Sequence, residues 1–330
     1  MKNARPSATI DARSIFRVGF TVLVLILLVK YLLENREQFA DIFGQLSLSA
    51  FIGMFFAQAA NDLVYGTGFR SVVRAQKVDV GLIAAWRIFV VSRFLGTFVP
   101  HSGLIYRGIA LKKEAGLQLK DYVHTAVAFS WYTLVASLAL SLLVLVIGGT
   151  EFKLLGVDSR WCVSLVLIAA IFIPVAGNNF LQGIGRIHPR ARPLVEKVQK
   201  ASSAILELFT FPRLIGVFSA LTVVSFVLTC ITIFFAFQSG GQQLGLFGLA
   251  LVFVAFRVSV VANFTPGNIG ILELVMAYVA SAQGFSASVG VFAMLAIRSV
   301  GFVALVSLTL LLGGAKALRG FDFAQEAPSS

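Results

Sequence analysis

Two apolar stretches of the chain each combine a helix-breaking proline with a charged residue seven positions after it. The charged residues are Arg107 in the first stretch and Glu273 in the second. A charge inside a bilayer costs about 2.5–3.5 kcal/mol on insertion scales unless it is paired or hydrated, so such residues usually mark a substrate pathway. We therefore expect Arg107 to neutralise an anionic group, and Glu273 to bind a cationic group or to gate through an arginine. A structural ion pair between these two side chains is the alternative.

Further polar side chains in or beside the apolar segments belong to the same hypothesis. They are Asp62, Arg93, Arg257, Asn263 and Arg298. We expect Arg257 and Arg298 to help Arg107 neutralise a phosphate, and Asp62 and Arg93 to line the same pathway. For Arg93 the alternative is a side chain that extends toward the membrane interface. For Asn263 the alternative is that it stabilises the broken backbone.

Proline and glycine provide the expected backbone breaks, in "GTFVPHSGLIYRGIA" and "ANFTPGNIGILELVM". We place the breaks at Pro100 and Gly103, and at Pro266, Gly267 and Gly270. Proline removes a hydrogen-bond donor and glycine tolerates unusual φ, so a helix can end there inside the membrane. Broken backbone at that depth must be buried in protein or face a water-filled cavity. The helix that follows begins with free N–H groups and a positive dipole end, which suits an anion such as a lipid phosphate.

The elements that carry these residues are apolar helices. Of the 330 residues, 58% are hydrophobic and 13% are charged, which is too apolar for a soluble domain of this size. Several segments are long enough to cross a hydrocarbon core of about 30 Å. The expected spans cover residues 16–33, 46–69, 121–148, 161–181, 214–238 and 287–313. The sequence thus predicts an all-α polytopic membrane protein.

Residues 82–115 and 244–283 do not fit a single span, because each is an apolar helix, a break and a second short helix. Each region is either two spans or a re-entrant hairpin. With hairpins, the chain forms two repeats of three transmembrane helices and one broken hairpin. Three crossings are an odd number, so the second repeat is expected to be inverted. We expect the first repeat at 1–150, and the second at 151–320 with a cytoplasmic linker at 182–213. A polar tail follows at 321–330, and the linker is expected to hold an amphipathic helix around 193–209.

The net charge of +12 indicates membrane orientation rather than nucleic-acid binding. Basic residues concentrate in the segments that would be cytoplasmic if both termini were inside. We therefore expect a multi-pass protein of the cell membrane, specifically of the bacterial inner membrane, with cytoplasmic N- and C-termini. The two cysteines, Cys162 and Cys230, are far apart and indicate neither a disulfide framework nor a metal site. We expect no metal and no cofactor.

The two broken regions resemble a flippase-like family typified by the transmembrane region of lysylphosphatidylglycerol synthases. The resemblance lies in two segments, "FVPHSGLIYRGIALKKEAGLQLKDYV" and "TPGNIGILELVMAYVASAQGFSASVGVFAMLAIRSVG", and the second is the more specific motif. The segment "GTGFRSVVRAQKV" is also similar to a cytoplasmic loop of the family. It implies that the protein moves phospholipids or polyprenyl-linked lipids between leaflets. Arg107, Glu273 and then Arg298 are the site residues that carry over. The synthases also have a soluble aminoacyl-transfer domain, which we do not expect here, so an enzyme activity is not implied.

The leading hypothesis is therefore a flippase that moves an anionic phospholipid or a polyprenyl-phosphate lipid through a central charged cleft. An integral-membrane transferase acting on lipid-linked substrates is one alternative. It would require a general base or metal-binding carboxylates at one interface, and no such cluster is evident. A membrane scaffold for a cell-envelope pathway is the other alternative, with an envelope-synthesis protein as its partner.

Overall fold

The protein folds into a bundle of α-helices with one short hairpin of strands. The computed structural model describes residues 26–27, 29–44, 47–98, 102–117, 119–147, 153–154, 157–158, 160–172, 196, 199, 202–203, 205–206, 211–262 and 268–314. The helices are α2 (Arg36–Gly44), α3 (Leu48–Ala75), α4 (Leu82–Phe98), α5 (Ser102–Ala115), α6 (Leu119–Ile147), α9 (Pro212–Ser239), α10 (Leu246–Ala262), α11 (Ile271–Ala282) and α12 (Ala287–Leu311). The antiparallel strands are β1 (Lys153–Leu154) and β2 (Val157–Asp158), and a further apolar helix covers Arg160–Phe172.

Three of the described helices are long and apolar enough to cross a membrane. They are Ala126–Ile147 within α6, Pro212–Ser239 and Ala287–Leu311. These helices confirm the expected spans at 121–148, 214–238 and 287–313. The span expected at 46–69 corresponds to α3, which is as long as α9 at 28 residues but more polar. The spans at 16–33 and 161–181 lie partly outside the described residues, as does most of the helix expected around 193–209.

Local sequence signals explain where the two central helices begin. The hydroxyl of Ser47 accepts a hydrogen bond from the Ala50 N–H at 3.1 Å, which satisfies one of the free donors at the start of α3. Pro212 is the first residue of α9, where its missing N–H is not needed and its fixed φ favours a helix.

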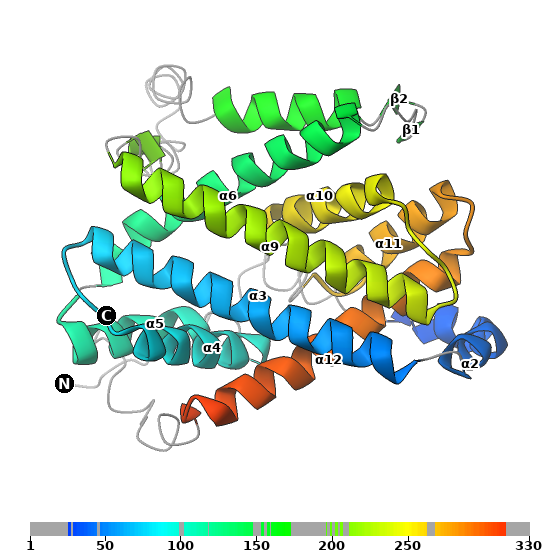
Figure 1. Ribbon diagram of the computed structural model, residues 1–330, viewed down its shortest axis with the longest axis horizontal. Helices are drawn as coiled ribbons and strands as arrows, with labels where there is room; N and C mark the ends of the chain where they lie inside the picture. Colours follow the sequence, from blue (N-terminus) through cyan, green and yellow to red (C-terminus); the bar gives the residue numbers. More distant parts are fainter. Residues whose placement is uncertain are drawn as a thin grey trace, which may run out of the picture.

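The same order of helix lengths occurs twice along the chain. Helices α3, α4, α5 and α6 have 28, 17, 14 and 29 residues, and α9, α10, α11 and α12 have 28, 17, 12 and 25. The contacts between helices also form matching sets: α3 meets α6 as α9 meets α12, α6 meets α9 as α12 meets α3, and α6 meets α10 as α12 meets α4. Helices α3 and α9 lie side by side in the middle of the molecule and run in opposite directions (Figure 1).

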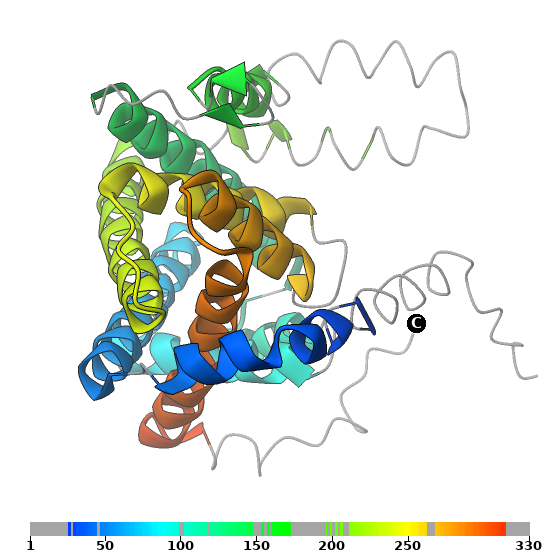
Figure 2. The same cartoon turned by 90° about the vertical axis from the view of Figure 1, so that its right-hand side faces the viewer.

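Each set of helices has its own hydrophobic core. The largest core is formed mainly by α9, α10, α11 and α12, and the next largest mainly by α3, α4, α5 and α6. Two smaller clusters join the sets, one between α6 and α10 and one between α4 and α12. Residues 26–34 and α2 lie beside α12 (Figure 2), where the hydroxyls of Tyr31 and Ser288 are hydrogen-bonded at 2.9 Å. The arrangement places α3 and α9 between the two cores, so any polar group on these helices is held at the centre of the bundle.

Candidate functional site

A cavity of about 480 Å³ lies between α3, α4, α5 and α6. Its wall combines two arginines with aromatic, hydroxyl and aliphatic side chains. The lining residues are Tyr65, Phe69, Val72, Phe89, Arg93, Arg107, Tyr122, Ala126, Phe129, Ser130, Thr133 and Leu134. The cavity is therefore a largely apolar hollow into which two arginines and several hydroxyl groups project.

The Arg107 guanidinium is held in this cavity by neutral side chains. Its Nε donates to the Ser92 hydroxyl at 2.6 Å, and its Nη1 donates to the Tyr122 hydroxyl at 3.1 Å. Its Cζ lies 4.8 Å from the ring centre of Phe89 and 5.9 Å from that of Phe69, within cation–π range. No carboxylate in the described part of the chain forms an ion pair with it. Arg107 is thus an oriented cation whose charge no carboxylate in the described part of the chain neutralises.

The close packing of α5 on α4 determines where Arg107 lies. A Cβ at Gly103 would be 2.2 Å from the Ser92 carbonyl oxygen, so only glycine permits this approach. One helical turn later, Arg107 reaches the Ser92 side chain. We expected Gly103 to provide unusual φ at a break. Instead it is the second residue of α5, and its φ is not positive, so its role is the close approach of two helices.

Asp62 and Arg93 form an ion pair at the edge of the same cavity. The Arg93 Nη1 donates to the Asp62 Oδ1, and Asp62 is almost completely buried in the middle of α3. Arg93 is the more exposed partner and also lines the cavity. The pathway role expected for both residues is untested, but they do lie beside Arg107. Because Asp62 neutralises Arg93, Arg107 provides the excess positive charge of the cavity.

A second ionic cluster lies at the start of α11. The Glu273 Oε1 accepts from the Arg298 Nε at 2.7 Å, and its Oε2 accepts from the Gly270 N–H at 2.7 Å. The Arg298 Nη2 also donates to the Asn268 carbonyl at 3.0 Å. Gly270 has a φ of 83°, a left-handed conformation that glycine tolerates, directly before the first residue of α11. One N–H that we expected to face a ligand anion binds Glu273 instead.

The structure divides the predicted site residues between these two clusters. Arg93, Arg107 and Asp62 surround the cavity, whereas Glu273 pairs with Arg298. The alternative pairing of Arg107 with Glu273 is therefore wrong. Arg257 is the twelfth residue of α10, as Arg93 is of α4, but its side chain is outside the described residues. Asn263, Pro100, Pro266 and Gly267 lie outside them as well.

Sequence reasoning missed the neutral side chains that hold Arg107, namely Ser92, Tyr122, Phe89 and Phe69. Ser92 directly precedes Arg93 in an apolar helix, and that adjacency was the one available signal. Tyr122 lies fifteen residues from Arg107 on the next helix, and only the packing of α5 against α6 brings them together.

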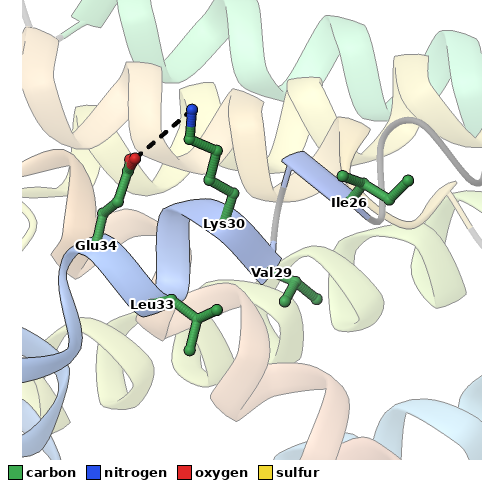
Figure 3. Close-up of a pocket in the computed structure, with 5 residues that line it drawn as sticks. All are labelled: Ile26, Val29, Lys30, Leu33 and Glu34. Carbon is green, nitrogen blue, oxygen red and sulfur yellow. Dashed lines mark ion pairs between the residues drawn. The ribbon is translucent and has the colours of Figure 1, made fainter.

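An open groove at the N-terminal helix does not resemble a binding site. It has a volume of about 570 Å³ and is lined by Ile26, Val29, Lys30, Leu33 and Glu34. Figure 3 shows Lys30 and Glu34 on one side of the helix, with an exposed ion pair of 3.7 Å, and Leu33 on the other side.

Among the described residues, no group of three or more His, Cys, Asp or Glu side chains could hold a metal ion.

Residues 14–308 match the model of the family described as "Lysylphosphatidylglycerol synthase TM region". The chain belongs to this family. The match confirms the resemblance noted in the sequence and covers both ionic clusters. Together with the apolar helices α6, α9 and α12, membership of this membrane family makes the chain a multi-pass membrane protein. No curated protein and no solved structure matches the chain.

Proposed function

We propose that this protein moves an anionic lipid, either a phospholipid or a polyprenyl-phosphate lipid, between the two leaflets of a membrane. The head group binds in the cavity at Arg107, and the acyl or prenyl chains remain in the surrounding lipid. The observation that carries the proposal is Arg107, which two hydroxyls orient in a hollow of about 480 Å³ and which no described carboxylate neutralises. That size falls in the range of about 300–1,000 Å³ typical of ligand pockets.

The chemistry of Arg107 favours phosphate as the ligand. A cation inside a membrane protein is costly unless an anion or water compensates it. Guanidinium groups match phosphate oxygens in geometry and bind them through charge-assisted hydrogen bonds. Nε and one N–H of Nη1 donate to Ser92 and Tyr122, and no other described residue accepts from the remaining N–H groups, which in this proposal bind the ligand.

Inverted repeats would give this site access to both leaflets in turn. We propose repeats at 1–150 and 151–320, with α4–α5 and α10–α11 as re-entrant hairpins. At 1.5 Å per residue, α5 and α11 are about 21 Å and 18 Å long, which is short for a core of about 30 Å. The matched helix contacts and the opposite directions of α3 and α9 also support inversion, because repeats related by an axis along the membrane normal would make these helices parallel.

In this proposal the two ionic clusters have different states. The cavity at Arg107 is open to a head group, whereas Glu273 and Arg298 form a closed pair. Rocking of the two repeats would open one cluster as it closes the other. We place the protein in the bacterial inner membrane with both termini cytoplasmic.

Leaflet exchange in vesicles tests the proposal. Purified protein is reconstituted into phosphatidylethanolamine–phosphatidylglycerol vesicles that contain acyl-labelled NBD-phosphatidylglycerol, and dithionite quenching reports the label that reaches the outer leaflet. Exchange should be at least tenfold slower in Arg107→Gln, since a charged hydrogen bond is worth about 1.5–3 kcal/mol.

The matched control is Arg87→Gln. Arg87 is a half-exposed arginine of α4 that pairs with Glu114 at 2.7 Å and does not line the cavity. This variant should exchange the lipid at the wild-type rate. Equal rates for wild type and Arg107→Gln would contradict the proposal, as would a wild type that exchanges no faster than empty vesicles.

A further inference from the structure

A group of neutral polar side chains lies where α3 and α9 meet, and of its four members Tyr65 also lines the Arg107 cavity. We call Asn61, Tyr65, Ser225 and Thr229 the crossing tetrad. The Asn61 Nδ2 donates to the Thr229 hydroxyl at 3.4 Å, and the Ser225 hydroxyl donates to the Tyr65 hydroxyl at 3.1 Å. Both bonds join the two central helices, so the tetrad lies between the two cores.

The two hydrogen bonds of the tetrad are related by the repeat. Asn61 and Ser225 are each the fourteenth residue of their helix, and Tyr65 and Thr229 are each the eighteenth. Exchanging α3 with α9 therefore converts one bond into the other. The tetrad thus lies on the approximate two-fold axis of the bundle, and in transporters with inverted repeats the substrate binds at the interface of the repeats near the midplane.

The tetrad is connected to both ionic clusters by the polar face of α3. Gln58, Asn61, Asp62 and Tyr65 recur at helical spacing, so they lie on one face. At one end, Tyr65 lines the Arg107 cavity. At the other end, the Gln58 Nε2 donates at 3.4 Å to the carbonyl of Ile297, the residue before Arg298. Seven residues of helix span about 10 Å, so this face bridges the two clusters.

The hydrogen bonds along this face are incompletely formed. Two of them are 3.4 Å long, compared with about 2.9–3.0 Å for a typical N–H···O bond. The Asn61 Oδ1 is buried and has no hydrogen-bond partner in the described part of the chain. A buried polar atom without a partner costs about 1–3 kcal/mol. A polar ligand that forms hydrogen bonds with such groups is therefore bound favourably. Because the groups are uncharged, the binding is weak enough for the ligand to be released.

We propose that the crossing tetrad is an intermediate binding station for the lipid head group as it passes between the two ionic clusters. The inference rests on the proposed function and adds a third site to it. Hydroxyl and amide donors of the tetrad bind the phosphate oxygens, and the Asn61 Oδ1 accepts a hydrogen bond from a hydroxyl or amine of the head group.

Two threonines of α9 provide a matched test. Thr229→Val removes the hydroxyl that Asn61 contacts. Thr232→Val is the control, because the Thr232 hydroxyl donates at 2.9 Å to the Leu228 carbonyl of its own helix. Asn61→Leu removes the other partner of the bond. All variants are compared in the NBD-phosphatidylglycerol exchange assay, and their affinity for soluble dihexanoyl-phosphatidylglycerol is measured by calorimetry.

We expect Thr229→Val and Asn61→Leu to exchange lipid about fivefold more slowly, the effect of losing one hydrogen bond of about 1 kcal/mol. Their affinity for the soluble lipid, which reports the Arg107 cavity, should stay within twofold of wild type. Thr232→Val should match the wild type in both measurements, and the thermal midpoints should agree.

Wild-type exchange rates in Thr229→Val and Asn61→Leu would overturn the inference and leave the proposed function intact. Loss of affinity in parallel with loss of exchange would also overturn it, because the tetrad would then act on the cavity alone. If Arg107→Gln retains wild-type affinity and exchange, the proposed function fails, and the intermediate station fails with it.

Discussion

Met54 and Phe218 occupy the same position in α3 and α9, and each packs into the hydrophobic core of the opposite set of helices. Each is the seventh residue of its helix and fully buried. Met54 belongs to the core formed mainly by α9–α12, and Phe218 to the core formed mainly by α3–α6, where its ring lies 4.6 Å from that of Phe129. The two cores are therefore interlocked at the central pair of helices.

Truncation of Phe218 should lower the stability of both sets of helices together. Phe218→Ala leaves a cavity beside Phe129, and such changes cost about 3–5 kcal/mol in protein cores. We expect a single unfolding transition with a clearly lower thermal midpoint. The midpoint is measured in detergent, from the folded fraction that size-exclusion chromatography recovers after heating. Phe56→Ala is the control, since Phe56 is 65% exposed in α3. Two separate transitions in Phe218→Ala would show that the cores are not interlocked.

Addition of one methyl group at Gly103 should disable the cavity. In Gly103→Ala the new Cβ would meet the Ser92 carbonyl oxygen at 2.2 Å, so α5 must move away from α4 and take Arg107 with it. We expect at least a tenfold loss of affinity for dihexanoyl-phosphatidylglycerol by calorimetry. Gly96→Ala is the control, because nothing lies within 4 Å of a Cβ there. Equal affinities in the two variants would refute the packing argument.

Tyr122 should act on the ligand through the orientation of Arg107. Tyr122→Phe removes the hydroxyl that accepts from the Arg107 Nη1 and preserves the ring, so affinity for the soluble lipid should fall about fivefold. Tyr132→Phe is the control, since its hydroxyl contacts Ser219 outside the cavity. The double variant Tyr122→Phe with Ser92→Ala should lose less binding free energy than the sum of the losses in the two single variants, because both hydroxyls hold one guanidinium. Strictly additive losses measured by calorimetry would argue against this shared role.

The sequence was sufficient to predict α3, α6, α9 and α12 and the division of residues 82–115 and 244–283 into two helices each, because long apolar runs and proline and glycine residues are local signals. Arg107, Asp62 and Arg93 were proposed as site residues by the same reasoning, because charged residues are rare in apolar helices. The partners of these charges depend on packing between distant helices. Thus the pairing of Glu273 with Arg298 and the role of Gly103 against Ser92 could not be predicted from spacing. Serine, threonine and asparagine also occur in apolar helices without special roles, so the crossing tetrad became visible only once α3 and α9 were placed side by side.

Reversal of the charges of Glu273 and Arg298 should fail to restore the second cluster. Glu273 neutralises Arg298 with one oxygen and accepts from the Gly270 N–H with the other. The double variant Glu273→Arg with Arg298→Glu re-forms an ion pair but leaves that N–H without its acceptor and puts a cation at the start of α11. We therefore expect the double variant to remain as unstable as Glu273→Gln in thermal unfolding.

The double variant Arg87→Glu with Glu114→Arg is the matched control. That pair is half-exposed and links α4 with α5 through side chains alone, by a 2.7 Å hydrogen bond. Because both charges persist and no backbone donor in the described contacts depends on them, the exchanged pair should keep a thermal midpoint close to that of the wild type. Full recovery of the midpoint in the Glu273–Arg298 double variant would mean that the ion pair alone, and not the capping of α11, stabilises the break.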